Sequence, residues 1–144
     1  MQFGEFRTKE TNIELESSRQ EKEGEMILVI DADPYARDIA GRFLEVLGYQ
    51  ALLARNGVEA MEFFRQNNFK IQAVVLDVVL PEAAAEEIFK ELRQLRSDLP
   101  IILCSSHSQQ DLALRFAKNG TAKFLPKPLS FSKLELAVGK ATRS

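Results

Sequence analysis

Short apolar runs alternate along the chain with longer stretches in which apolar residues recur every three or four positions. The short runs predict buried strands, because a parallel sheet covered by helices on both faces has no polar side. We expect these strands at residues 27–30, 50–54, 73–76, 101–104 and 124–126. The strict alternation of strand and helix signals predicts an α/β domain with a parallel sheet.

The longer stretches predict five helices with recognisable ends. The first begins after Asp33, a good N-cap followed by a proline, and Gly48 is placed to end it. A second helix opens at Gly57, and a third follows a loop marked by Pro81 and runs to about residue 96. The fourth, at about 109–118 and closed by Asn119-Gly120, is the weakest, and the last follows a cap at residue 130.

The first 25 residues differ from the rest in composition. They carry seven acids and four bases and lack hydrophobic periodicity, so we expect a flexible acidic tail or linker at 1–25. The whole chain has a net charge of -2, which gives no electrostatic reason to expect nucleic acid or an anionic membrane as partner. One cysteine and no apolar stretch of membrane-spanning length suggest a cytoplasmic protein.

Four polar residues follow the ends of predicted strands. Asp31 closes the first apolar run, Asp77 the third and Ser105 the fourth, and Lys127 follows the last. Because the carboxyl ends of parallel strands form the ligand crevice of such sheets, we expect two acids, a hydroxyl and an amine to converge there. More ordinary interpretations stay open: a helix cap for Asp77 or Ser105, and for Asp31 a partner that holds Lys127 in place.

In order and spacing, these segments resemble the receiver domain of two-component response regulators. The resemblance rests on residues 27–31 followed by Asp33-Pro34, on residues 75–77 with Leu80-Pro81 downstream, on Ser105, and on Lys127-Pro128. It covers 26–142, and residues 48–49, 56–60 and 92–100 are similar to receivers at the C-termini of hybrid sensor kinases. The resemblance implies a flavodoxin-like, doubly wound sheet of five parallel strands in order 2-1-3-4-5 with five helices.

The resemblance also implies roles for single residues. Asp77 would be the phosphoacceptor, forming an aspartyl phosphate, with Ser105 donating to a phosphoryl oxygen and Lys127 pairing with the phosphoryl charge. Asp31, Asp77 and the main-chain carbonyl of Val79 would bind Mg²⁺. Phosphoryl transfer depends on positioning and on neutralising charge spread over oxygens, which is why a carboxylate nucleophile needs a cation and fixed donors beside it.

Three positions depart from the family pattern. Ala32 stands where receivers carry a second acid that binds Mg²⁺ directly, so we expect weak Mg²⁺ binding. Asp33 lies one residue further on, at the helix cap, where its side chain is expected to point elsewhere. Phe124 replaces a frequent tyrosine, and Ala85 a frequent glycine, where a backbone with positive φ would strain an alanine.

Two functions of different class follow. The first is a stand-alone receiver in a phosphorelay, not a turnover enzyme, phosphorylated by a histidine kinase or phosphotransfer protein. It would signal to an unknown output protein, or form a homodimer, through a surface that includes Leu112, Arg115, Phe124 and Lys133. The alternative is a receiver-like interaction module that is not phosphorylated and is held by an Asp77–Lys127 ion pair. A nucleotide or flavin binder is disfavoured, because no glycine-rich phosphate loop follows the first strand.

Overall fold

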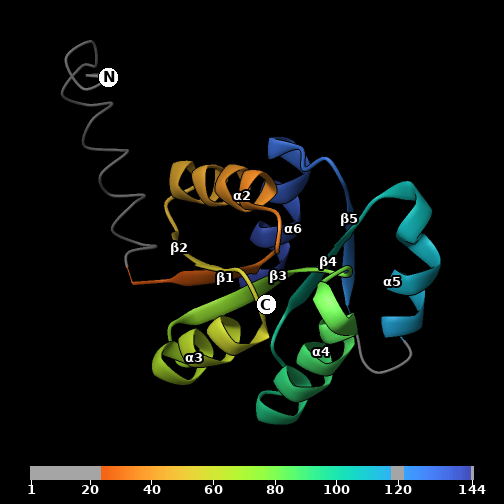
Figure 1. The fold of residues 1–144 in the computed structure, drawn as a ribbon. Coiled ribbons are helices and arrows are strands. Elements are labelled where there is room, and N and C mark those ends of the chain that lie inside the picture. The colour runs from red at the N-terminus through yellow and green to blue at the C-terminus, as the bar shows by residue number, and fades with distance from the viewer. Residues whose placement is uncertain (1–23, 118–121, 144) are drawn as a thin grey trace, which may run out of the picture.

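The computed structural model describes residues 24–117 and 122–143 as one α/β domain (Figure 1). Its five parallel strands lie in the order β2-β1-β3-β4-β5, which confirms the predicted sheet. The strands are β1 (Met26–Ile30), β2 (Gln50–Ala54), β3 (Ile71–Asp77), β4 (Ile101–Ser105) and β5 (Lys123–Pro126). The helices are α2 (Pro34–Val46), α3 (Gly57–Asn67), α4 (Ala84–Leu95), α5 (Gln110–Ala117) and α6 (Phe131–Arg143).

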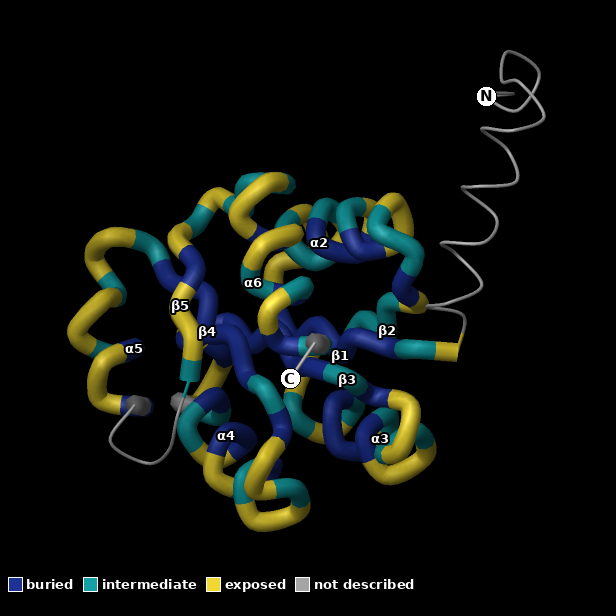
Figure 2. Tube along the Cα trace, turned by 180° about the vertical axis from the view of Figure 1, so that it is seen from behind, coloured by how far each residue is buried: buried dark blue, intermediate teal, exposed yellow. Residues whose placement is uncertain are grey.

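Two apolar cores lie on opposite faces of the sheet. Helices α2 and α6 cover one face and α3, α4 and α5 the other (Figure 1). Strand β1 is buried along its whole length (Figure 2). Its side chains alternate between the two cores. Phe43 on α2 and Phe131 on α6 meet edge to face with their ring centroids 5.3 Å apart. A sheet buried on both faces explains why its strands are continuous apolar runs.

The predicted helix ends of α2 are confirmed. The Asp33 carboxylate accepts a hydrogen bond from the Tyr35 amide at 3.0 Å, as an N-cap does. Gly48 has a φ of 96°, a left-handed conformation in which glycine avoids the steric penalty of a Cβ. The Asp33 cap fixes the start of α2 directly after the carboxyl end of β1, next to Asp31.

One sequence expectation is wrong. Ala85 lies buried within α4, and the residue with positive φ in this region is Glu82, at 63°. Glu82 sits in a short 3-10 helix, Pro81–Ala83, that leads into α4. The backbone turns three residues earlier than expected, so an alanine at position 85 causes no strain.

Two further expectations concern segments that the structure does not describe. Most of the expected tail at 1–25, and the end of the fourth helix with Asn119-Gly120, lie outside the described residues. Within them, α5 is a helix of eight residues preceded by a 3-10 turn, His107–Gln109. No helix in the described ranges is both long and apolar enough to cross a membrane.

Candidate functional site

Three polar residues are buried in the described part of the chain, and all three are predicted site residues. Asp31, Asp77 and Ser105 have exposed fractions of 6%, 7% and 6%. Each stands at or just after the carboxyl end of a neighbouring strand, β1, β3 or β4. Burying a carboxylate is unfavourable unless it is paired and hydrogen-bonded, so the fold must supply partners for the two acids.

Lys127, just after β5, supplies a partner for both acids. Its Nζ lies 2.9 Å from Asp31 Oδ2 and 3.0 Å from Asp77 Oδ2. The Lys127 amide donates to the main-chain oxygen of Ser105 at 2.9 Å, which ties the lysine to the end of β4. The Lys127–Pro128 peptide bond is cis. The two acids and the amine thus converge as predicted.

The second oxygen of each carboxylate accepts a main-chain hydrogen bond. Asp31 Oδ1 accepts from the Asp33 amide at 2.9 Å, and Asp77 Oδ1 accepts from the Val79 amide at 3.1 Å. Both carboxylates are therefore held at their two oxygens, with one oxygen of each directed to Lys127. Such fixed positions are what a nucleophilic carboxylate needs before a substrate arrives.

Arg37 is a site neighbour that the sequence analysis missed. Its Nη1 donates to the main-chain oxygen of Asp31 at 2.9 Å from the first turn of α2. Arg37 follows the Asp33 cap by four residues and so lies on the same side of the helix, but the sequence does not specify which carbonyl a side chain of that length reaches.

Burial and pairing change how the site titrates. Burial raises the pKa of Asp77, and the hydrogen bonds from the Val79 amide and Lys127 offset part of that rise. Burial opposes the charge of Lys127, but its hydrogen bonds to Asp31 and Asp77 leave its pKa raised. Burial also raises the pKa of Cys104, beside the site on β4, to about 12, so this thiol is a packing residue.

Few oxygen atoms near the site are available as ligands for Mg²⁺. Ala32 is exposed and offers no ligand, and the Asp33 carboxylate caps α2. No group of three or more acids, histidines or cysteines suited to a metal occurs among the described residues. Two carboxylates, Asp31 and Asp77, together with the Val79 carbonyl remain, and Mg²⁺ sites in proteins often use one or two carboxylates and several waters.

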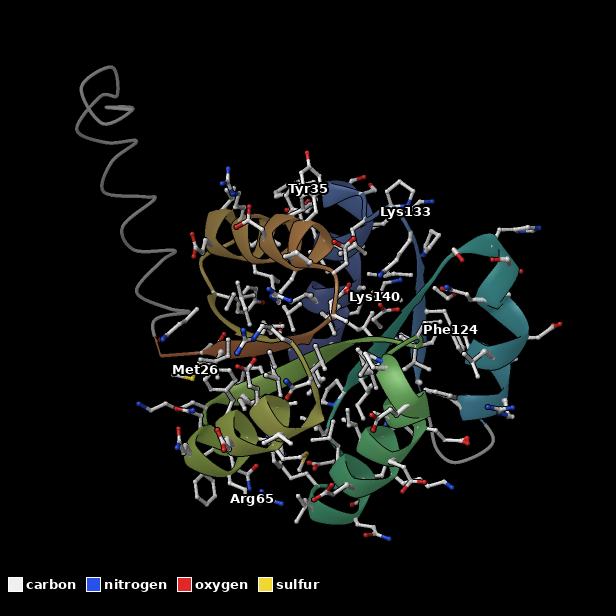
Figure 3. The ribbon with its side chains drawn as sticks, in the orientation of Figure 1. Met26, Tyr35, Arg65, Phe124, Lys133 and Lys140 are labelled. Carbon is white, nitrogen blue, oxygen red and sulfur yellow. The ribbon has the colours of Figure 1, made fainter. Side chains whose placement is uncertain are left out.

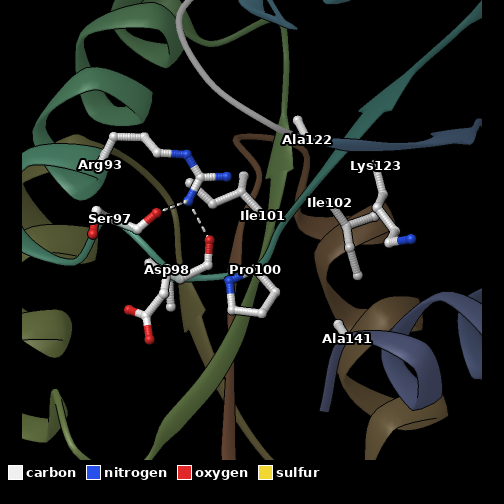
Figure 4. Close-up of a pocket in the computed structure, with 10 residues that line it drawn as sticks. Arg93, Ser97, Asp98, Pro100, Ile101, Ile102, Ala122, Lys123 and Ala141 are labelled. Carbon is white, nitrogen blue, oxygen red and sulfur yellow. Dashed lines mark hydrogen bonds between the residues drawn. The ribbon is translucent and has the colours of Figure 1, made fainter. Parts of the chain in front are cut away.

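Two hollows lie along β4 and β5, at opposite ends of these strands. A cavity of about 310 Å³ borders the site between α5 and β5, lined by residues that include Ser105, Leu114 and Phe124. A cavity of about 350 Å³ lies at the strands' amino-terminal end, where Arg93 donates to the carbonyls of Ser97 and Leu99 (Figure 4). The second hollow contains no predicted site residue.

Comparison with known proteins places these features in one family. Residues 27–139 match the response regulator receiver domain. The chain is 33% identical over 115 residues to the transcriptional regulatory protein ZraR of Klebsiella oxytoca, covering 80% of this chain and 26% of that protein. It is 34% identical over 108 residues to the response regulator MprA of Mycobacterium sp. (strain KMS), covering 75% and 46%. The chain thus spans less than half the length of these relatives.

Solved structures agree with the sequence comparison. A response regulator receiver domain protein from Clostridium thermocellum superposes with a TM-score of 0.76 at 26% identity, covering 82% of this chain and 94% of that one. The receiver domain of NtrX from Brucella abortus gives a TM-score of 0.74 at 23% identity, covering 82% and 98%, which supports the fold alone.

Proposed function

We propose that this chain, which belongs to the response regulator receiver domain family of two-component signalling, accepts a phosphoryl group on Asp77. Members of this family act as phosphoacceptors rather than turnover enzymes. The observation that carries the assignment to Asp77 is its buried carboxylate, held by the Val79 amide and by Lys127. An acid fixed in this way is positioned as a nucleophile beside a permanent cation.

The proposed transfer starts from a phosphohistidine on a histidine kinase or phosphotransfer protein. An Asp77 carboxylate oxygen attacks phosphorus, the P–N bond breaks, and its electron pair returns to the imidazole nitrogen, which takes up a proton. The product is an acyl phosphate on Asp77. Because charge is spread over the phosphoryl oxygens during transfer, nearby donors stabilise this state.

Lys127 and Ser105 are the donors that we assign to the phosphoryl group. The Lys127 ammonium already lies 3.0 Å from Asp77 Oδ2, so it needs little movement to pair with a phosphoryl oxygen. Ser105 is the last residue of the neighbouring strand β4 and lines the cavity beside α5. Its proposed role is one hydrogen bond to the phosphoryl group.

Receiver domains typically bind Mg²⁺, and Asp31, Asp77 and the Val79 carbonyl are the residues that would hold it here. Bound there, the ion would neutralise part of the phosphoryl charge. Ala32 removes one ligand, and the loss of a ligand's supporting partner alone lowers metal affinity about 10–100-fold. We therefore propose that this receiver binds Mg²⁺ more weakly than one with both acids.

The partner of a receiver is a histidine kinase, and we place the output partner at the surface formed by α5, β5 and α6. Leu114 and Phe124 are 59% and 42% exposed there, and Lys133, which Figure 3 labels on α6, is exposed as well. Arg115 is exposed, whereas Leu112 packs against the core and contributes less than the sequence suggested. This surface would serve an output protein or a second copy, in the cytoplasm with its kinase.

The test is intact mass after incubation with acetyl phosphate, with and without Mg²⁺. A phosphoryl adduct that needs Mg²⁺, disappears in Asp77→Asn and persists in Asp98→Asn is the expected result. Asp98 is a matched control because it is an exposed acid far from the site, at the other end of β4. An adduct retained in Asp77→Asn would remove the assignment to this residue.

One observation favours a second function. Lys127 pairs with both acids at once, so the site is already neutralised in large part without a metal. A receiver-like interaction module that is never phosphorylated would keep this arrangement permanently. Absence of any adduct from a cognate phosphohistidine protein, together with no Mg²⁺ binding by calorimetry, would select that function.

A further inference from the structure

A groove between α3 and α4 lies on a face that the proposed function does not use. It has a volume of about 410 Å³ and an apolar floor that includes Met61 and Ile88. Gly57, at the start of α3, deepens it, because a Cβ there would meet Ile88 Cδ1 at 3.1 Å. Val58 borders the same end and is 72% exposed, although it is a large apolar residue. The groove therefore offers apolar surface to a partner.

Acids dominate the rim of this groove. Glu62, Glu87 and Glu91 line it, against a single base, Arg65 of α3, which is labelled in Figure 3. Arg65 Nη2 lies 3.0 Å from Glu91 Oε1, so that base and that acid neutralise each other. Glu62 and Glu87 are exposed and form no ion pair within the described part of the chain. The rim thus carries a net charge of -2 over an apolar floor.

The length of the groove sets the size of its occupant. On α3 its lining runs from Gly57 to Arg65, and on α4 from Ala84 to Glu91, about two helical turns on each side. At 1.5 Å per residue this is roughly 12 Å, which matches two turns of a third helix. Both walls are helices whose main-chain groups are already hydrogen-bonded, so no free strand edge is available to an extended peptide.

We propose that the α3–α4 groove binds an amphipathic helix of a partner protein, with apolar anchors facing the floor and lysine or arginine beside them. Anchors at i, i+3 or i+4, and i+7 would face this floor and contact Val58, Met61 and Ile88. The basic flanks would pair with Glu62 and Glu87. The same charges would repel an acidic helix and the phosphate backbone of a nucleic acid.

The probe is a fluorescein-labelled 18-residue helical peptide of leucine and lysine, with leucines at i, i+3, i+4 and i+7. Its binding is measured by fluorescence anisotropy at low salt, using the whole chain. We expect Glu62→Lys/Glu87→Lys to weaken binding about tenfold or more, because two attractive contacts become repulsive. Glu45→Lys/Glu135→Lys is the control, since it changes the net charge equally at exposed acids on α2 and α6. It should change the affinity by less than about threefold.

A second pair of variants tests the apolar contact. Val58→Gln should weaken binding several-fold, whereas Val46→Gln should not, although Val46 is equally exposed at 70% on α2. Circular dichroism melts establish that each variant is folded. Equal losses in groove and control variants would overturn the proposal. So would amide chemical-shift changes confined to α5, β5 and α6, or equal binding of a scrambled peptide. Because none of these measurements uses phosphorylation, they can fail while the proposed function holds.

Discussion

Lys127→Met isolates the contribution of the one cation that both buried acids share. Methionine keeps most of the aliphatic length of the side chain and removes its charge. In the parent protein the lysine Nζ lies 2.9 Å from Asp31 Oδ2 and 3.0 Å from Asp77 Oδ2. The variant leaves two carboxylates side by side without a positive charge between them.

The distances set the size of the effect. Two oxygens at 2.9 and 3.0 Å from one nitrogen lie within 5.9 Å of each other, so their repulsion is roughly 3 kcal/mol at an effective dielectric constant of 20. Removing one partner of a fully buried ion pair costs about 3–5 kcal/mol. The Lys127 side chain is 21% exposed, so solvent screens part of this. We expect the free energy of unfolding to fall by about 2–3 kcal/mol at pH 7.5.

The site also determines whether the loss of stability grows or shrinks as the pH changes. Without Lys127, the Asp77 carboxyl faces the charge of Asp31 with no cation beside it, which raises the pKa of Asp77 in the folded state further. The folded variant then binds more protons than the unfolded chain, so its stability falls as the pH rises through the raised Asp77 pKa. The deficit should therefore shrink at pH 5. In the parent, the Lys127 pKa is raised, so its contribution is complete below pH 10.5 and is lost as the pH rises through the higher folded value.

Urea unfolding followed by circular dichroism at pH 5.0 and 7.5 measures both effects. Lys123→Met is the matched control, because Lys123 is an exposed lysine on β5, and it should change stability by less than about 0.5 kcal/mol. Adding Asp77→Asn to the variant should restore a large part of the loss, since one of the repelling charges is gone. A loss as small as that of the control, or one equal at both pH values, would refute the reasoning.

Three further changes test other parts of the structure. Ala32→Asp should raise Mg²⁺ affinity in calorimetry about 10–100-fold and speed Mg²⁺-dependent phosphorylation; no change in either would contradict the account of a missing ligand. Glu82→Gly should raise stability in urea by about 0.5 kcal/mol, because the left-handed φ of 63° disfavours a side chain; a loss equal to that of an ordinary helix glycine would contradict it. Arg96→Met should lower stability by about 2 kcal/mol, since its Nη1 donates to the carbonyls of Asn68 and Ile71 at 2.8 and 2.7 Å. Arg42→Met, which removes only an exposed pair, is the control, and equal losses would exclude a role for those two bonds.

The sheet could be predicted from the sequence because a strand buried on both faces has a simple pattern. Five apolar runs, each followed by a turn or a capped helix, are sufficient to predict five parallel strands. The convergence of Asp31, Asp77 and Lys127 followed from the same topology, since the carboxyl ends of neighbouring strands share one edge. Here local pattern and global fold agree, and prediction succeeded.

The expectation for Ala85 failed because a family position was transferred without local geometry. Whether a loop turns at residue 82 or 85 depends on how Pro81 and the first turn of α4 share the backbone bend, which side-chain type does not specify. Arg37 was missed for a related reason. Its partner is the main-chain oxygen of Asp31, and sequence patterns carry little information on which carbonyl a long side chain reaches.

The charges of the site link its resting stability to its proposed chemistry. Two carboxylates and one ammonium leave a net charge of -1, where a second acid at position 32 would leave -2. Lys127 therefore neutralises a larger share of the negative charge here, and the binding free energy of a divalent cation is less favourable. The same pairing holds Asp77 Oδ2 beside the Lys127 ammonium, which would pair with the negative charge of the phosphoryl group. Because of Ala32, the resting site has less negative charge for Mg²⁺ to neutralise. During transfer, the charge on the phosphoryl oxygens would still have to be neutralised. If Asp77 is the phosphoacceptor as proposed, we expect slow, Mg²⁺-dependent phosphorylation of a chain that is stable without Mg²⁺.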